Sequence, residues 1–215
     1  MIPGTIPISA NLMPVITYLG SSVSALSSSF TFSSLDFGPA AGDRLIVAAY
    51  VVQDLGTFTV DSVTIGGVSA SLVVGSNSAD SNRLRAAISR ALVPSGTSGS
   101  IVVDTSTLCN YCALSWYSIT GLNSVTANST DADDAGQTLT ATINISVGGI
   151  GIAVAGSSNS GGASWSGLTE NTDFDVAGQR FTSASEQYVG GSTGQVVSVT
   201  FTANATEAMV AAAWR

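Results

Sequence analysis

Short segments rich in apolar and β-branched residues recur about every ten residues from Val15 to the end of the chain. Polar or glycine-containing turns separate them. No segment combines the 3.6-residue apolar period with the capping residues that predict a helix. This spacing is typical of antiparallel sandwiches and barrels. The sequence therefore predicts an all-β, jelly-roll-like antiparallel β-sandwich of about 12–14 short strands.

Two segments give the clearest strand predictions. The nearly continuous apolar run 44–53 predicts a central strand that is covered on both faces. Residues 57–65 and 68–74 flank the pair Gly66-Gly67. Because primed two-residue turns need positive φ, this pair between β-branched runs predicts a hairpin.

The first 13 residues predict an extended N-terminal arm, and residues 14–215 a single sandwich domain. Pro3 and Pro7 prevent regular sheet pairing in the arm. Two interpretations stay open: a terminus without fixed structure, or an arm that binds a neighbouring subunit. In the second interpretation the binding residues are the isolated apolar side chains of the arm, Ile2, Ile6, Ile8 and Leu12.

A faint internal repeat divides the domain into halves, 14–122 and 138–215, joined by an acidic loop at 123–137. Each copy has an apolar strand, a second β-segment, an arginine-containing strand and a Gly/Ser turn. Each ends on a tryptophan strand, with Trp116 in the first copy and Trp214 in the second. Chance similarity between β-rich segments is the alternative. A real repeat implies two halves of similar topology, since a solenoid needs at least about three repeats.

The composition removes most catalytic groups. The chain has no histidine, its six basic residues are all arginines, and 9% of its residues are charged. Histidine is the commonest general acid–base group, and lysine is a common nucleophile. The net charge of −8 argues against nucleic-acid binding, and no run approaches the ~18 apolar residues of a membrane span. We therefore expect a non-enzymatic protein with no cofactor and no nucleic-acid or membrane partner.

Three groups of residues are candidates for chemistry or binding. Cys109 and Cys112 lack the helix of a redox motif and the further ligands of a zinc site, so free thiols or a local disulfide are expected. The segment 131–136 is similar to a fragment of a calcium loop, with Asp131, Asp133 and Asp134 as weak candidate ligands. A solvated acidic loop is the default interpretation of that segment.

A third group could bind a glycan. Glu170 and Asp173 lie close in sequence to Trp165, which follows a flexible Ser/Gly loop at 156–162. Carboxylates beside aromatic rings can bind or hydrolyse sugars. The default interpretation of the tryptophan is a packing residue.

The segment Asp61-Ser62-Val63-Thr64-Ile65-Gly66-Gly67-Val68-Ser69-Ala70 resembles a hairpin of small all-β structural proteins from tailed bacteriophages and prophages. The resemblance implies a virion component, assembled in the cytoplasm of the bacterial host. The expected role is a capsid decoration or cement protein that forms homo-oligomers and binds the major capsid protein or other virion proteins. The alternative is a tail or fibre component that binds host-surface glycans through the third group.

Overall fold

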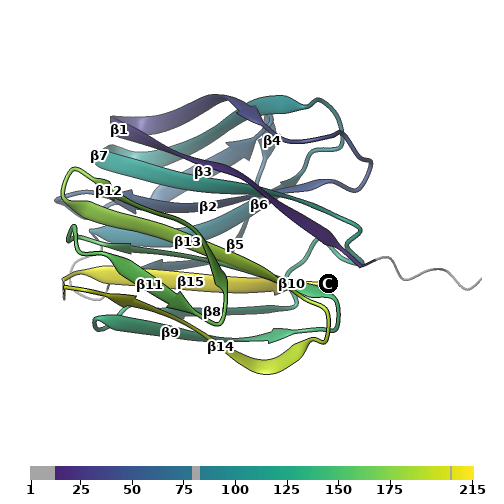
Figure 1. The fold of residues 1–215 in the computed structure, drawn as a ribbon. Coiled ribbons are helices and arrows are strands. Elements are labelled where there is room, and N and C mark those ends of the chain that lie inside the picture. Colours follow the sequence, from purple (N-terminus) through teal and green to yellow (C-terminus); the bar gives the residue numbers. More distant parts are fainter. Residues whose placement is uncertain (1–12, 79–82, 204) are drawn as a thin grey trace, which may run out of the picture.

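The computed structural model describes residues 13–78, 83–203 and 205–215. These residues form fifteen strands and no helix (Figure 1), so the predicted all-β, antiparallel, sandwich-type fold is confirmed. The strands are β1 (Val15–Asp36), β2 (Leu45–Gln53), β3 (Val60–Ile65), β4 (Val68–Ser69), β5 (Ser71–Asn77), β6 (Leu84–Leu92), β7 (Ser98–Thr120), β8 (Ser129–Asp133), β9 (Thr138–Ile145), β10 (Gly149–Ser157), β11 (Ala163–Ser166), β12 (Thr169–Val176), β13 (Gln179–Tyr188), β14 (Ser192–Phe201) and β15 (Glu207–Trp214).

Strands β1–β7, here called the N-terminal half, form one sheet that folds over into two layers. The inner layer has the order β5-β6-β2-β7-β1 and uses residues 109–120 of β7 and 15–27 of β1. The outer layer has the order β4-β3-β7-β1 and uses residues 98–105 of β7 and 29–36 of β1. Both β1 and β7 therefore run through both layers.

Strands β8–β15, here called the C-terminal half, also form two layers, but as two separate sheets. The inner layer has the order β12-β13-β10-β15-β8 and the outer layer has the order β11-β14-β9. The inner layers of the two halves face each other, so the molecule is a stack of four layers (Figure 1). Apart from β4, which has no counterpart in the C-terminal half, the two halves have the same strand order.

Three apolar cores lie between the four layers. The N-terminal core includes Phe30, Tyr50 and Ile101, and the C-terminal core includes Leu139, Met209 and Phe201. The shared core lies between the two halves. All nine residues of β2 are buried, as predicted, and they alternate between two cores because successive side chains of a strand point to opposite faces.

The two tryptophans that end the repeated strands occupy different cores. Trp116 pairs with Ala48 of β2 and packs in the N-terminal core, whereas Trp214 pairs with Ile150 of β10 and packs in the shared core. They therefore face opposite sides of corresponding layers. The sequence repeat itself stays a prediction, and this pair of residues is not equivalent within it.

Two details of the predicted strand pattern are wrong. The strands are not all short, since β1 has 22 residues and β7 has 23. Register shifts and positive φ at Leu26 and Ser34 let β1 bend between layers without ending. The acidic segment 123–137 is not all loop, because β8 lies within it and pairs with β15. The predicted arm, residues 1–13, lies outside the described residues apart from its last position, Met13.

The predicted glycine hairpin is present between β3 and β4. Gly66 and Gly67 have φ values of 59° and 78°, the left-handed conformation that a primed turn requires at both positions. Near this hairpin, a fully buried arginine holds two loops together. The guanidinium of Arg44 donates five hydrogen bonds to backbone carbonyls, those of Gly38, Pro39, Val93, Ser95 and Gly96.

Candidate functional site

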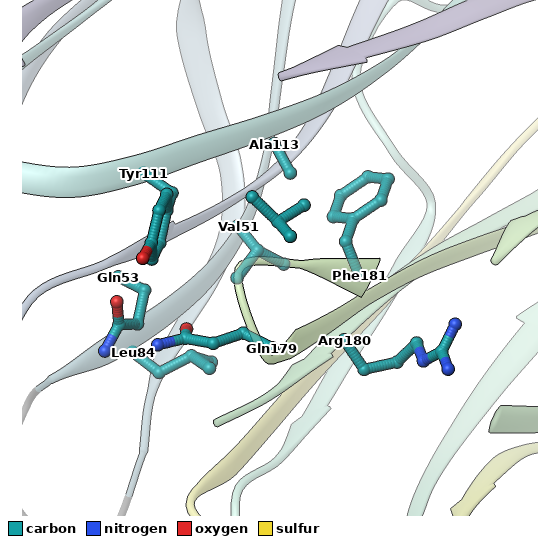
Figure 2. Close-up of a pocket in the computed structure, with 9 residues that line it drawn as sticks. Val51, Gln53, Leu84, Tyr111, Ala113, Gln179, Arg180 and Phe181 are labelled. Carbon is teal, nitrogen blue, oxygen red and sulfur yellow. The ribbon is translucent and has the colours of Figure 1, made fainter. Parts of the chain in front are cut away.

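A cleft opens between the two halves at one end of the shared core. Corresponding strands of the halves meet there: β2 and β10 end at the cleft, while β6 and β13 begin at it. Figure 2 shows its deeper part, with lining residues from both halves. Interfaces between packed units are frequent places for ligand sites. The cleft is therefore the candidate site that the fold itself positions.

The cleft has a narrow, apolar floor and a wider, polar mouth. Val51, Ala113 and Phe181 line the floor, where the free volume is about 20 Å³, the scale of a single water. The free volume of the mouth is about 240 Å³. The mouth is lined by Gln53, Leu55, Arg83, Leu84, Ser158, Gln179 and Thr206.

Gln53 is the last residue of β2, and the buried strand holds its side chain at the junction of floor and mouth. The residue is 5% exposed. Its Nε2 donates to the carbonyl of Asp54 at 3.0 Å, but its Oε1 accepts no hydrogen bond from any described residue. A buried acceptor without a partner costs about 1–3 kcal/mol. Figure 2 shows the polar ends of Gln53, Gln179 and Tyr111 on the same side of the pocket.

The chemistry of the lining favours binding over acid–base catalysis. Among the described residues that line the floor and the mouth, none is an aspartate, glutamate, histidine or cysteine. The polar groups are amides, hydroxyls and a guanidinium, which donate and accept hydrogen bonds. Arg180 contributes to the floor, but its guanidinium turns away (Figure 2) and donates to the carbonyls of Ser160 and Gly161.

The structure brings two of the three predicted glycan residues together, on β11 and β12 of the C-terminal half. Trp165 is half-buried and its Nε1 donates to Thr182 Oγ1 at 2.6 Å. Asp173 pairs with Thr182 in the strand register, and its Oδ1 lies 3.3 Å from Nη1 of Arg180. Both polar groups are thus engaged within the protein. Glycan binding by these residues stays a prediction.

Glu170, the third member of that group, is exposed on β12 three residues before Asp173. Partial desolvation and, secondly, the negative charge of Asp173 raise the pKa of Glu170, while Arg180 opposes the shift. The negative charge of Asp173 therefore reaches the carboxyl group of Glu170. Their electrostatic coupling alone indicates no reaction.

Two of the three calcium candidates, Asp131 and Asp133, have a structural role. Asp131 Oδ2 accepts a hydrogen bond from the backbone N–H of Thr142 at 2.6 Å, and Asp133 Oδ2 accepts one from Thr140 at 2.7 Å. Asp133 Oδ1 also accepts from the N–H of Asp134. In the described part of the chain, no three His, Cys, Asp or Glu side chains are grouped to hold a metal ion. The geometry gives the calcium prediction no support.

Cys109 and Cys112 are free thiols, buried in β7 against the N-terminal core. Burial raises the pKa of both thiols. Because the thiolate is the reactive form, two buried protonated thiols are poor nucleophiles. Of the two forms expected from the sequence, the structure has the reduced one.

The sequence analysis did not identify the cleft residues. Gln53 was placed correctly at the end of a central strand, and Gln179 lies just before the arginine-containing strand of the second copy. The available signal was a polar residue that ends an otherwise apolar buried run. This signal predicts where a strand ends. It does not predict which strand end of the other half lies across the cleft from it.

The fold and the cleft define a class: an all-β protein of two stacked, two-layered halves with a polar cleft between them. Across the described ranges, no helix is long and apolar enough to span a membrane. No protein-family profile matches the chain, and no curated protein sequence matches it.

Two solved structures are similar over most of their length. A chain of the crystal structure of cucumber necrosis virus matches with a TM-score of 0.30 and 12% identity, covering 93% of this chain and 85% of that chain. The ANX2 ectodomain from Arabidopsis thaliana matches with a TM-score of 0.26 and 8% identity, covering 91% and 83%. At such TM-scores neither likeness carries an argument about function.

Proposed function

We propose that this chain is a non-enzymatic structural protein of a bacteriophage or prophage particle, a capsid decoration protein that binds the major capsid protein. The observation that carries the proposal is the unpaired edge of β1. This 22-residue strand pairs with β7 along one edge, and no other described strand pairs with it. Long unpaired edges favour the addition of a strand from another chain.

The side chains along β1 support an interface there. Val23 is 45% exposed and Leu26 is 68% exposed. Leu108 of β7, next to the residue that pairs with Ser27, is 58% exposed. Apolar side chains beside an open strand edge add buried area to main-chain pairing. The predicted arm, residues 1–13, precedes this strand in the sequence, and we assign both to one proposed binding surface.

The absence of histidine and lysine from the sequence supports a role without catalysis. The described residues that line the cleft include no carboxylate, which agrees with that role. Residues of β1 and the arm then act through main-chain pairing and apolar contact alone.

Binding to purified heads of the phage or prophage that encodes the chain tests the proposal. We expect the wild type to co-sediment with heads, and Val23→Lys and a variant that begins at Met13 to lose association. Charge at an edge opposes strand addition. Val196→Lys is the matched control, because Val196 is 52% exposed on β14 of the other half.

Thermal unfolding of each variant separates lost binding from lost folding. Unchanged association of Val23→Lys would overturn the β1 interface. Location of the wild-type chain on tails, by immunogold labelling of whole virions, would overturn the decoration role and favour the tail or fibre alternative.

A further inference from the structure

We propose that a pocket of the N-terminal half, between β3 and β6, is a binding site for a single carboxylate group anchored by the guanidinium of Arg85. The pocket opens between the two layers of this half and has a free volume of about 100 Å³, several times what one water needs. Among the described residues, none lines both this pocket and the cleft, and none of its lining residues belongs to β1. The inference therefore does not depend on the proposed role in a particle.

The C-terminal half fills the corresponding space with a tryptophan. By strand order, β11 and β13 of that half correspond to β3 and β6. Trp165 of β11 packs against the C-terminal core, and its Nε1 donates to Thr182 of β13. Arg85 and Thr182 both lie near the start of their strands, and each precedes by two residues an alanine of the core between its layers, so each faces that core. Strand β3 contains no tryptophan, and the space beside Arg85 is open.

The guanidinium of Arg85 has donors to spare. Of its five N–H groups, one has a partner among the described residues: Nη1 donates to Oδ1 of Asn77 at 3.1 Å. Its Nε is enclosed, so no ligand reaches that atom, but Nη2 is neither enclosed nor bonded to a described residue. A Cβ on Gly75 would lie 2.9 Å from Nη2, so the glycine leaves room for the guanidinium. No described carboxylate lies within ion-pair distance of Arg85.

Two hydroxyls on the inner wall of the pocket add to the surplus of donors. The hydroxyls of Tyr50 and Ser89 lie 3.3 Å apart and carry two protons, but they share one hydrogen bond. Burial raises the pKa of Tyr50 to about 12, while the hydrogen bond with Ser89 and the positive charge of Arg85 oppose the shift. The phenol therefore keeps its proton. Because both hydroxyls are almost fully buried, a ligand that enters the pocket meets the guanidinium first.

A singly charged carboxylate fits this set of donors. A guanidinium binds the two oxygens of a carboxylate as a fork, and Arg85 is the only cation among the described lining residues. Asp61 lies exposed at the rim, and its negative charge opposes a doubly charged ligand such as phosphate. Val60 and Leu72 provide apolar wall for a short aliphatic stem. The ligand is therefore a free short-chain acid, or the side chain of an aspartate or glutamate of another chain.

Arginine side-chain signals in ¹⁵N-labelled protein provide a direct test. Acetate, butyrate and a glutamate blocked at both backbone ends are titrated separately, with phosphate and chloride as reference anions. We expect at least one carboxylate to shift the Arg85 Nε–H signal in a saturable way, at lower concentration than either reference anion. Tighter binding of butyrate than of blocked glutamate would identify a free acid as the ligand, and the reverse order would identify a protein side chain.

Arg85→Gln should weaken carboxylate binding at least about tenfold, the effect of one lost charge-assisted hydrogen bond, followed at the backbone amide of Ser89. Arg85→Lys keeps the charge without the fork, so its affinity should be intermediate, and it keeps the test valid if Arg85→Gln does not fold. Arg90→Gln is the matched control. Arg90 is also a half-buried arginine of β6, but it lies five residues on and faces the opposite side of the sheet.

The Arg90→Gln protein should bind carboxylates as the wild type does. The inference is overturned if no carboxylate shifts the Arg85 signal, or if phosphate or chloride shifts it at the same concentration as the carboxylates. It is equally overturned if Arg85→Gln and Arg85→Lys bind as the wild type does, or if Arg90→Gln loses as much affinity as Arg85→Gln.

Discussion

The two halves have the same strand order but connect their layers by different means. In the N-terminal half, β1 and β7 pass from the inner to the outer layer without ending. In the C-terminal half, the corresponding connections are broken: β8 ends at Asp133 before β9 begins, and β14 ends at Phe201 before β15 begins. The N-terminal half therefore builds this topology with continuous strands, and the C-terminal half builds the same topology with interrupted strands.

Side chains replace the missing backbone continuity in the C-terminal half. Ser129, Asp131 and Asp133 alternate along β8 and accept hydrogen bonds from the N–H groups of Asn144, Thr142 and Thr140 on β9. We call this row of bonds the seam. Residues two apart on a strand point the same way, so three acceptors at this spacing match three N–H groups of the neighbouring edge. The seam thus holds the two separate sheets of the C-terminal half together, as the bent strands hold the two layers of the N-terminal half together.

Removing the buried arginine of the N-terminal half should have the largest effect. Arg44→Met leaves five carbonyls without their donor, so we expect unfolding to become easier by about 3–5 kcal/mol. Arg180→Met in the C-terminal half removes two carbonyl contacts and one ion pair from a half-buried position. We expect that variant to lose about 1–2 kcal/mol. Urea unfolding of both measures the difference.

Arg44→Lys makes the comparison interpretable if Arg44→Met does not fold. Lysine keeps the charge but has three donors in place of five, so its stability should lie between those of the wild type and Arg44→Met. Equal losses for Arg44→Met and Arg180→Met would show that the fully buried guanidinium contributes no more to stability than the half-buried one.

The sequence predicted those strands and turns correctly whose conformation depends on neighbouring residues alone. The nearly continuous apolar run 44–53 and the Gly66-Gly67 turn depend on neighbouring residues only, and the buried strand and the hairpin that they predict are both present. The continuity of β1 was missed because serines and Leu26 interrupt its apolar pattern. Its pairing along all of β7 supplies hydrogen bonds that no local pattern encodes.

A close approach between the halves at Gly156 should give the next largest effect. A Cβ on this residue of β10 would lie 2.7 Å from Cγ1 of Val51 on β2. Valine is stiff at χ1, so Gly156→Ala should cost about 1–3 kcal/mol by overpacking the shared core. Adding Val51→Ala should restore part of that loss. A double-mutant cycle by urea unfolding measures the coupling; strictly additive losses would mean that the two residues do not meet.

The seam should contribute less, because its residues are only half-buried. Asp131→Ala removes the acceptor for the Thr142 N–H, and we expect a loss of about 1 kcal/mol. Hydrogen exchange locates the effect: the Thr142 amide should exchange faster, while the amides of residues 29–32 in the corresponding part of β1 keep their rates. Asp131→Asn retains one acceptor oxygen and should be milder. Unchanged exchange at Thr142 would mean that the seam does not hold β9.

The seam also shows why the acidic segment was misassigned from the sequence. Closely spaced aspartates are typical of solvated loops and of calcium loops. Here Asp131 and Asp133 lie on an edge strand whose partner N–H groups come from residues 140 and 142, after a turn. The cleft could not be predicted for the same reason, since Gln53 and Gln179 come to line one cleft only after both halves have folded.

The smallest expected effects are on the pH dependence of stability. They come from one carboxylate in each half, and the two effects have opposite signs. Hydrogen bonds from Ser29 and Ser62 lower the pKa of Asp104. Its stabilisation is therefore present above the unfolded value of about 3.9 and is lost as the pH falls through the lowered pKa. Asp104→Asn should flatten the acid side of the stability profile.

Glu170 in the C-terminal half behaves the other way. Desolvation raises its pKa, so the folded state binds more protons than the unfolded state just above about pH 4.3. Stability then falls as the pH rises through that window, and Glu170→Gln should remove the fall and be slightly more stable than the wild type at pH 7. Urea unfolding from pH 3 to pH 7 measures both variants against the wild type. Parallel profiles for the two variants would contradict the opposite environments that the two halves give their carboxylates.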